Sequence, residues 1–341
     1  MKFIRPVYIL SILLIGFFSC TGPEKKDAPK TNVPAEKATP KDNLTELNDG
    51  IQANPEKADL YFQRAQIFVQ RNVMSSAFSD ASKAVQLDSN KVPYLLLLAD
   101  ISFKTYQIRK ASDCFERVTK IDPKNPEGYL KLSELYFYIK GYQKSIFYAN
   151  EALKIDKHLV KAYYLKGFVY KEKGDTALAV SSFNTVVDLQ PEDYDAYIQL
   201  GNIYSVRRSF LALQYYNNAL RLRPSSTEAL YNRGLFLQNT NEVDKAMLDY
   251  RTILKIDPSY SDAYYNMGYI NSVMRKNYKD AIVNYTDAIR TNDQYAEAFY
   301  NRGVCYEMLG DKASARKDYT AALGVVPTYK EAKARLQQLA N

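Results

Sequence analysis

A short side chain recurs in this sequence about every 34 residues, and this repetition constrains the fold more than any other feature. The recurring positions, called here the first small series, are Ala65, Ala99, Ser133, Gly167, Gly201, Gly234, Gly268 and Gly303. Their spacings are 34, 34, 34, 34, 33, 34 and 35 residues. A fixed period of this length indicates stacked copies of one supersecondary unit.

A second small series follows the first by about twelve residues in each unit. Its members are Ala77, Ala111, Ser145, Ala179, Ala212, Ala246, Ala281 and Ala315. Helices approach closely only where side chains are short, so the two series predict a pair of touching helices per unit. The predicted units are 58–91, 92–125, 126–159, 160–193, 194–226, 227–260, 261–295 and 296–329. A one-residue deletion near Arg208 and an insertion near Lys276 are expected in the turns between paired helices.

Large side chains surround the small ones at helical spacing, which predicts a buried face on each helix. In the first helices they lie four residues before the small residue, at Tyr61, Leu95, Tyr129, Tyr163, Tyr197, Leu230, Tyr264 and Phe299. In the second helices they lie about four residues after it, at Phe115, Phe183, Tyr216, Tyr250, Tyr285 and Tyr319. Five units close with a proline in the same phase: Pro123, Pro191, Pro224, Pro258 and Pro327. Proline biases the preceding residue away from the helix and so predicts the turn to the next unit.

These positions resemble the tetratricopeptide repeat family, whose motif reads W-x2-L-G-x2-Y, then A-x3-F, then P. The unit 160–193 carries Tyr163, Gly167, Tyr170, Ala179, Phe183 and Pro191 at the matching places. Tyr, Leu or Phe replaces the family's Trp throughout. The resemblance spans residues 58–329 and implies an all-α solenoid, in which eight helix-turn-helix repeats form a right-handed superhelix with a concave groove. Segments 44–57 and 330–341 are each expected to add a capping helix, because terminal repeats otherwise expose their core.

The N-terminal segment carries the pattern of an export signal. Lys2 and Arg5 precede an apolar run from Val7 to Phe18, which suits a signal peptide and is short for a bilayer span. The following Ser19-Cys20 resembles a bacterial lipobox, implying a signal peptide at 1–19 and acylation, as with palmitate, at Cys20. Two other interpretations of this segment stay open: an ordinary signal peptide in which the cysteine occurs by chance, and an uncleaved membrane anchor. Residues 20–43 contain four prolines among charged residues and are expected to be a disordered tether.

Charge and reactive residues argue against several classes of protein. The net charge of +8 comes from mixed signs without the basic stripe that a nucleic-acid partner needs. Cys114 and Cys305 lie six repeats apart and are expected to be small core residues. The single histidine, His158, falls in a turn between repeats, which leaves no multi-histidine metal site and no evident base for a nucleophile. We therefore expect no catalytic residues, no metal and no cofactor.

In the tetratricopeptide family the first helix of each repeat lines the groove, and the resemblance carries this role to fifteen positions. They are Phe62, Leu96, Leu130, Phe137, Tyr138, Tyr164, Phe168, Ile198, Asn202, Tyr231, Leu235, Tyr265, Tyr269, Tyr300 and Val304. An apolar and aromatic row on an exposed face is typical of a binding surface, and tyrosine suits an extended or helical peptide. The alternative is that these side chains pack on one another.

Acidic residues recur six positions before the first small series. They are Asp59, Glu127, Asp195, Glu228, Asp262 and Glu297, in the first turn of each helix, where the helix dipole favours them. They would also give the groove rim a negative bias. The family's carboxylate clamp is incomplete in this register, because its cationic positions hold Ile198, Asp262 and Asn266 beside Asn202 and Asn232.

The sequence therefore predicts a non-catalytic scaffold or adaptor of the bacterial cell envelope that binds other envelope proteins, or peptide segments of them, in its groove. The expected location is the outer membrane, facing the periplasm, with the lipid on Cys20 as the membrane contact and no nucleic acid as partner. The residue after Cys20 is Thr21, and not the aspartate that commonly signals retention in the inner membrane. Two alternatives stay open: a self-associating homo-oligomeric subunit of a secretion or assembly machine, and a binder of cell-wall glycan.

Overall fold

The computed structural model describes residues 43–340, and over that range the chain is helical without a strand. The predicted fold class, an all-helical array of paired helices, is confirmed. The predicted signal peptide, Cys20 and all of the tether except Asn43 lie outside the described residues. Within the described range, no helix combines the length and the apolar character needed to cross a membrane.

Each repeat contributes a first and a second helix, joined by a short turn. The first helices are α2 (Ala58–Gln70), α4 (Val92–Lys104), α6 (Pro126–Tyr138), α8 (Val160–Glu172), α10 (Tyr194–Val206), α12 (Thr227–Asn239), α14 (Ser261–Tyr269) and α16 (Ala296–Met308). The second helices are α3 (Met74–Leu87), α5 (Ile108–Ile121), α7 (Tyr142–Ile155), α9 (Thr176–Leu189), α11 (Leu211–Leu222), α13 (Val243–Ile256), α15 (Tyr278–Thr291) and α17 (Lys312–Val325). A single helix flanks each end, α1 (Asn43–Ala53) and α18 (Lys330–Ala340).

The small series marks the contact between the paired helices, as predicted. A Cβ atom on Gly201 would lie 2.5 Å from the ring of Tyr216, and one on Gly234 would lie 2.9 Å from the ring of Tyr250. Both rings are buried, with exposed fractions of 1% and 0%. The ring therefore occupies the space that a longer side chain on the first helix would need. This close packing of a large ring against a glycine stabilises each hairpin.

Each first helix is followed by a residue with left-handed backbone conformation, at nearly the same position in every repeat. Six of these residues are not glycine, and Asn72 and Asn241 have φ angles of 58° and 66°. After Asn72, the amide of Val73 donates to the carbonyl of Phe68 at 2.8 Å, which is the closing bond of a Schellman motif. The same turn in successive repeats gives the hairpins a common geometry.

The insertion in the seventh repeat differs from the prediction. The extra residue lies before the turn, where α14 continues as a π-helix, η1 (Ile270–Met274). Repeats 1 and 6 have seven residues between the small residue and the left-handed residue, whereas the seventh has eight, from Gly268 to Lys276. A π-turn closes its hydrogen bond over one more residue than an α-turn, so it takes up the inserted residue inside the helix. The deletion near Arg208 shortens the second helix and not the turn. Helix α11 has 12 residues and begins three residues after Arg208, whereas α3 has 14 and begins two residues after Asn72.

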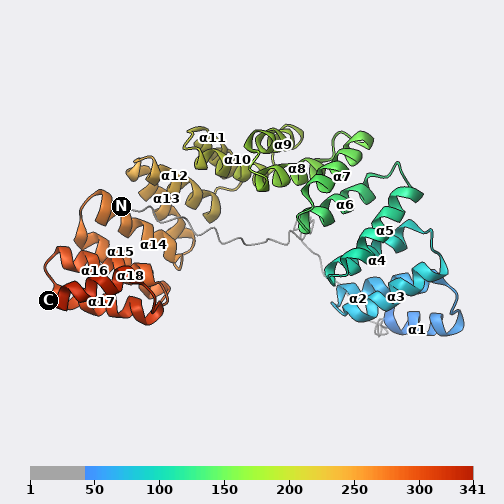
Figure 1. Cartoon of the computed structure of the whole chain (residues 1–341), viewed down its shortest axis with the longest axis horizontal. Coiled ribbons are helices and arrows are strands. Elements are labelled where there is room, and N and C mark those ends of the chain that lie inside the picture. The colour runs from blue at the N-terminus through green and yellow to red at the C-terminus, as the bar shows by residue number, and fades with distance from the viewer. Residues whose placement is uncertain (1–42, 341) are drawn as a thin grey trace, which may run out of the picture.

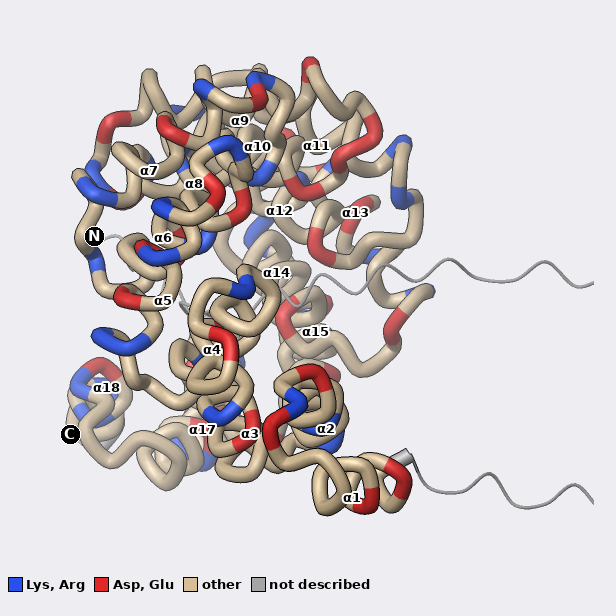
Figure 2. Tube along the Cα trace, turned by 90° about the vertical axis from the view of Figure 1, so that its right-hand side faces the viewer, with Lys and Arg blue, Asp and Glu red and all other residues tan. Residues whose placement is uncertain are grey.

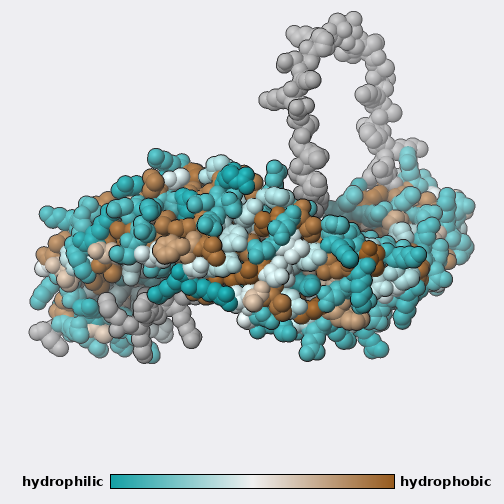
Figure 3. Space-filling model, turned by 90° about the horizontal axis from the view of Figure 1, so that it is seen from above, coloured by the Kyte–Doolittle hydropathy of each residue, from teal (hydrophilic) through white to brown (hydrophobic). Residues whose placement is uncertain are grey.

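The stacked hairpins curve into an arch (Figure 1). Helices α4, α6, α8 and α10 lie on the inner side of the arch, and their partners α5, α7, α9 and α11 lie on the outer side (Figure 1). Positive and negative residues are interspersed along the trace (Figure 2). The upper, outer surface shows separate apolar patches among hydrophilic side chains (Figure 3).

Candidate partner-binding surface

The first helices carry a nearly continuous row of large side chains, called here the inner row and defined by the fifteen positions predicted for the groove. Thirteen of them are partly buried, and Tyr138 is 47% exposed. Ile198 is the exception, because it is only 2% exposed and lies in the core with Tyr197 and Tyr216. A partner cannot reach Ile198, so its assignment to the groove was wrong. Its neighbours in the core cover the side-chain surface that a partner would have to contact.

In the N-terminal half, the row is a chain of aromatic contacts. Tyr138 meets Phe103 edge-on with ring centroids 5.2 Å apart. Phe137 reaches Phe168 of the next repeat at 6.3 Å, and Phe168 stacks on Tyr164 at 5.9 Å. Neighbouring repeats are thus linked through the row itself, and the expected packing of these side chains on one another accounts for part of it.

In the C-terminal half, the row becomes a series of tyrosine pairs, called here the tyrosine ladder. Tyr231, Tyr265 and Tyr300 each pack against the tyrosine that precedes the next first helix, and the pairs are Tyr231–Tyr260, Tyr265–Tyr295 and Tyr300–Tyr329. The centroid distances are 5.7, 4.9 and 5.2 Å. The amide of Asn301 donates to the hydroxyl of Tyr265 at 2.9 Å. These contacts fix the rings, so a partner would meet a surface with little side-chain entropy left to lose.

Three of the recurrent acidic residues accept hydrogen bonds from tyrosine hydroxyls about one repeat length away along the chain. Tyr295 donates to Asp262 at 2.8 Å and Tyr194 donates to Glu228 at 3.0 Å, while Tyr94 donates to Asp59. The helix dipole alone explains acidic residues in the first turn of a helix, so the sequence pattern does not predict this contact with tyrosine. A spacing of 33 to 35 residues between tyrosine and carboxylate was the available signal.

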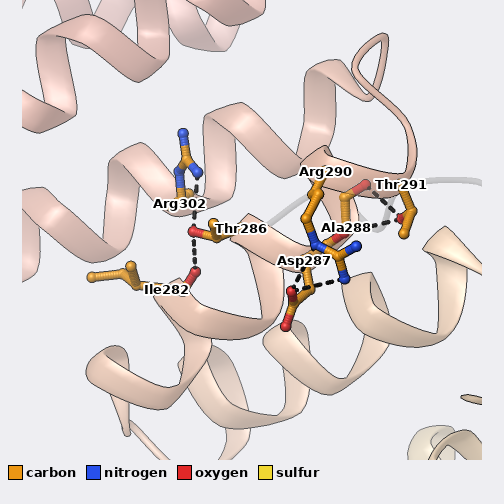
Figure 4. Close-up of polar contacts among 7 residues, drawn as sticks. All are labelled: Ile282, Thr286, Asp287, Ala288, Arg290, Thr291 and Arg302. Carbon is orange, nitrogen blue, oxygen red and sulfur yellow. Dashed lines mark hydrogen bonds and ion pairs between the residues drawn. The ribbon is translucent and has the colours of Figure 1, made fainter. Parts of the chain in front are cut away.

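Three arginines each join three helices in an arrangement called here the arginine clamp. Its members are Arg64 with Asp80, Arg233 with Asp249, and Arg302 with Asp318. In each clamp the Nε and Nη2 groups donate to both oxygens of the aspartate. Nη1 donates to the helix that precedes the repeat, which is α1 for Arg64, α11 for Arg233 and α15 for Arg302. For Arg302 that third acceptor is Thr286 of α15 (Figure 4). The clamp was also missed, although each aspartate follows its arginine by 16 residues.

Buried tyrosines orient other polar side chains along the first helices. The hydroxyl of Tyr216 donates to Asn202 at 2.9 Å, that of Tyr250 to Gln238 at 3.0 Å, and that of Tyr319 to Glu307 at 2.7 Å. Asn202 was predicted to contact a partner, and it is already one member of such a pair. The buried hydroxyls therefore hold the acceptors in place.

The described residues hold no cluster of three or more His, Cys, Asp or Glu side chains suited to a metal ion. His158 is exposed in its turn, where its backbone amide donates to Asp156 at 2.8 Å. Cys114 and Cys305 are buried free thiols, as predicted. A hollow of about 440 Å³ lies at the turn between repeats 4 and 5, where Arg223 covers the ring of Tyr194 at 4.2 Å. Its lining carries neither a histidine nor a cysteine.

The geometry defines a class of protein, namely an array of helical hairpins with a preformed aromatic inner row. Models of the tetratricopeptide repeat match residues 92–125, 160–193, 207–261 and 296–329. These four segments of the chain are tetratricopeptide repeats.

Two solved structures share this fold over most of the chain. The C-terminal part of a tetratricopeptide-repeat protein from Cytophaga hutchinsonii is 20% identical with a TM-score of 0.63, covering 72% of this chain and 99% of that one. A tetratricopeptide repeat protein from Parabacteroides merdae is 16% identical with a TM-score of 0.51, covering 73% of this chain and 99% of that one.

Curated relatives match over shorter stretches. The BBSome complex member BBS4 of Bos taurus is 23% identical over 146 residues, which are 42% of this chain and 28% of that protein. Its homologue in Drosophila melanogaster is 24% identical over 182 residues, 52% of this chain and 37% of that protein. The match thus spans less than two fifths of either relative.

Proposed function

We propose that this protein is a non-catalytic scaffold that binds segments of other proteins along the inner row. The observation that carries the proposal is the tyrosine ladder, because its rings recur in three successive repeats. Each packs against a second tyrosine, and the amides of Asn266 and Asn301 donate to Tyr231 and Tyr265. Rigid tyrosines offer contact area and hydroxyl groups at low entropic cost. The family's association with protein partners supports the same function.

The test is recovery of partners from an envelope extract with the full chain and with a Tyr231→Ala, Tyr265→Ala, Tyr300→Ala variant. A matched control replaces three exposed apolar residues of second helices, Phe147, Leu248 and Val283, by alanine. Circular dichroism at the working temperature confirms that both variants are folded. The ladder variant should lose partners that the control retains, and equal recovery by both overturns the proposal.

The proposed setting is the bacterial outer membrane, with the array facing the periplasm and a lipid on Cys20. Its support is the sequence alone: the positive residues Lys2 and Arg5, the apolar run Val7 to Phe18, and Ser19 before the cysteine. Metabolic labelling with a palmitate analogue should mark the chain and fail on Cys20→Ala. A Ser19→Ala control keeps a small residue before the cysteine and should stay labelled. Labelling of Cys20→Ala contradicts the anchor.

A second candidate function is self-association through the ends of the array. Among the described residues, α1 takes the place of a second helix before the first repeat, and α18 takes the place of a first helix after the eighth. The two helices carry opposite net charge: α1 has Glu46 and Asp49 without a basic residue, whereas α18 has Lys330, Lys333 and Arg335 against Glu331. Sedimentation of the Cys20→Ala chain tests this function. A mass that stays monomeric at all concentrations eliminates it.

A further inference from the structure

The C-terminal half of the inner row carries a carboxylate beside each tyrosine of the ladder. Glu228, Asp262 and Glu297 precede Tyr231, Tyr265 and Tyr300 by three residues on α12, α14 and α16. Residues three apart share one face of a helix, so carboxylate and ring lie together. Contacts confirm the proximity, because Tyr295 donates to Asp262 at 2.8 Å and also stacks on Tyr265 at 4.9 Å.

The charge of these carboxylates reaches the tyrosines. Burial, and after it the charge of Asp262, raises the pKa of Tyr231 to about 12. Burial and then the charge of Glu297 raise the pKa of Tyr265 to about 12. The ladder is therefore a surface on which negative charge and aromatic faces alternate.

No free cation offsets this charge on the same helices. Helix α14 and η1 contain neither Lys nor Arg, and α12 and α16 contain one Arg each. Those two, Arg233 and Arg302, are held by Asp249 and Asp318 of the second helices. The hydroxyl donors of Asp262 and Glu228 are neutral and leave the negative charge in place.

The N-terminal half is different. Lys131 donates to Asp100 at 2.7 Å and Lys161 donates to Glu134 at 2.9 Å, each pair joining adjacent first helices. Asp100 and Glu134 of this half are thus each paired with a lysine of the neighbouring first helix. Helices α12, α14 and α16 thus carry carboxylates beside the ladder that no lysine pairs with in this way. At the C-terminal end of the ladder, Arg335 of α18 lies near Tyr300 and pairs with Glu307 at 3.1 Å.

We propose that the tyrosine ladder selects a cationic, extended segment of the partner, with Lys or Arg side chains placed against Asp262 and Glu297 and over the tyrosine rings. This inference rests on the proposed function of the inner row. Opposite charge gives an interface its specificity and register, and tyrosine faces attract cations. A neutral or acidic segment would leave the carboxylates without a counter-charge.

The test measures binding of two labelled peptides of equal length to the full chain by fluorescence anisotropy. One alternates Lys with Pro and Leu, and the other has Glu in place of Lys. The Asp262→Asn, Glu297→Gln variant removes two charges and keeps the acceptor for Tyr295. A matched control, Asp244→Asn with Asp287→Asn, removes two charges from second helices, where Asp287 pairs with Arg290 (Figure 4).

The wild-type chain should prefer the cationic peptide, and the inner variant should weaken that binding about tenfold while the control stays within about twofold. Added salt should also weaken the binding of the cationic peptide to the wild-type chain. Equal affinity for both peptides, or an equal loss in the control, overturns the inference. Envelope partners that depend on the ladder tyrosines and not on the two carboxylates would overturn the charge preference and leave the scaffold function intact.

Discussion

Arg302 donates through Nε and Nη2 to both carboxylate oxygens of Asp318, at 2.8 and 2.7 Å. The carboxylate is 4% exposed, and hydrogen bonding to it raises the pKa of Arg302. The third donor, Nη1, reaches Thr286 of the preceding repeat at 3.0 Å (Figure 4). A single side chain thus links α15, α16 and α17, so the clamp couples repeat to repeat as well as helix to helix.

Arg302→Ala should lower the free energy of unfolding by about 3 kcal/mol, because Asp318 would keep a buried charge without its partner. Urea titration measures this change. Arg290→Ala is the control: its pair with Asp287 lies within one helix with Arg290 63% exposed, and its loss should cost less than about 0.5 kcal/mol. Equal destabilisation by the two variants would contradict the role of the clamp.

Gly234→Leu should destabilise the chain by about 2 to 3 kcal/mol, since the new Cβ alone would lie 2.9 Å from the buried ring of Tyr250. Thermal unfolding followed by circular dichroism gives the shift. Gly324→Ala is the opposite case, because no atom lies within 4 Å of its added Cβ and the residue is inside α17. That change should stabilise the chain by about 0.5 kcal/mol. An unchanged midpoint for Gly234→Leu would refute the packing.

Stability should fall as the pH rises from about 10 to 12. The folded pKa values of Tyr231 and Tyr265, about 12, exceed the ordinary value of 10.0, so the folded state holds these protons more tightly than the unfolded state. The stabilisation is complete below pH 10 and is lost as the pH passes the folded values. Unfolding free energies measured across this range should decline less steeply for Tyr265→Phe than for wild type. Identical slopes would contradict the raised pKa of Tyr265.

Cys305 and Cys114 should resist alkylation in the folded chain. They are 1% and 2% exposed, and burial raises the pKa of the Cys305 thiol to about 12, so very little thiolate exists at pH 8. Iodoacetamide labelling, resolved residue by residue with mass spectrometry, should mark both only after denaturant is added. Labelling at the same rate with and without denaturant would show that the thiols are accessible.

The core of each hairpin was predictable because it depends on local periodicity. The small series and the aromatic residues four positions along the second helix are visible in one repeat and recur in the next. Gly201 against Tyr216 and Gly234 against Tyr250 follow directly from that spacing. The inner row was harder to predict, because periodicity alone does not separate a side chain that faces solvent from one such as Ile198, which lies in the core.

The sequence by itself determined the helical pairs, their number and the buried positions, because helix contacts depend on side-chain size at a fixed spacing. The tertiary structure alone decided what joins one repeat to another. The arginine clamp and the bond of Tyr295 to Asp262 need partners brought together from separate helices. Such directional contacts depend on distances of a few tenths of an ångström, which spacing along a chain does not specify.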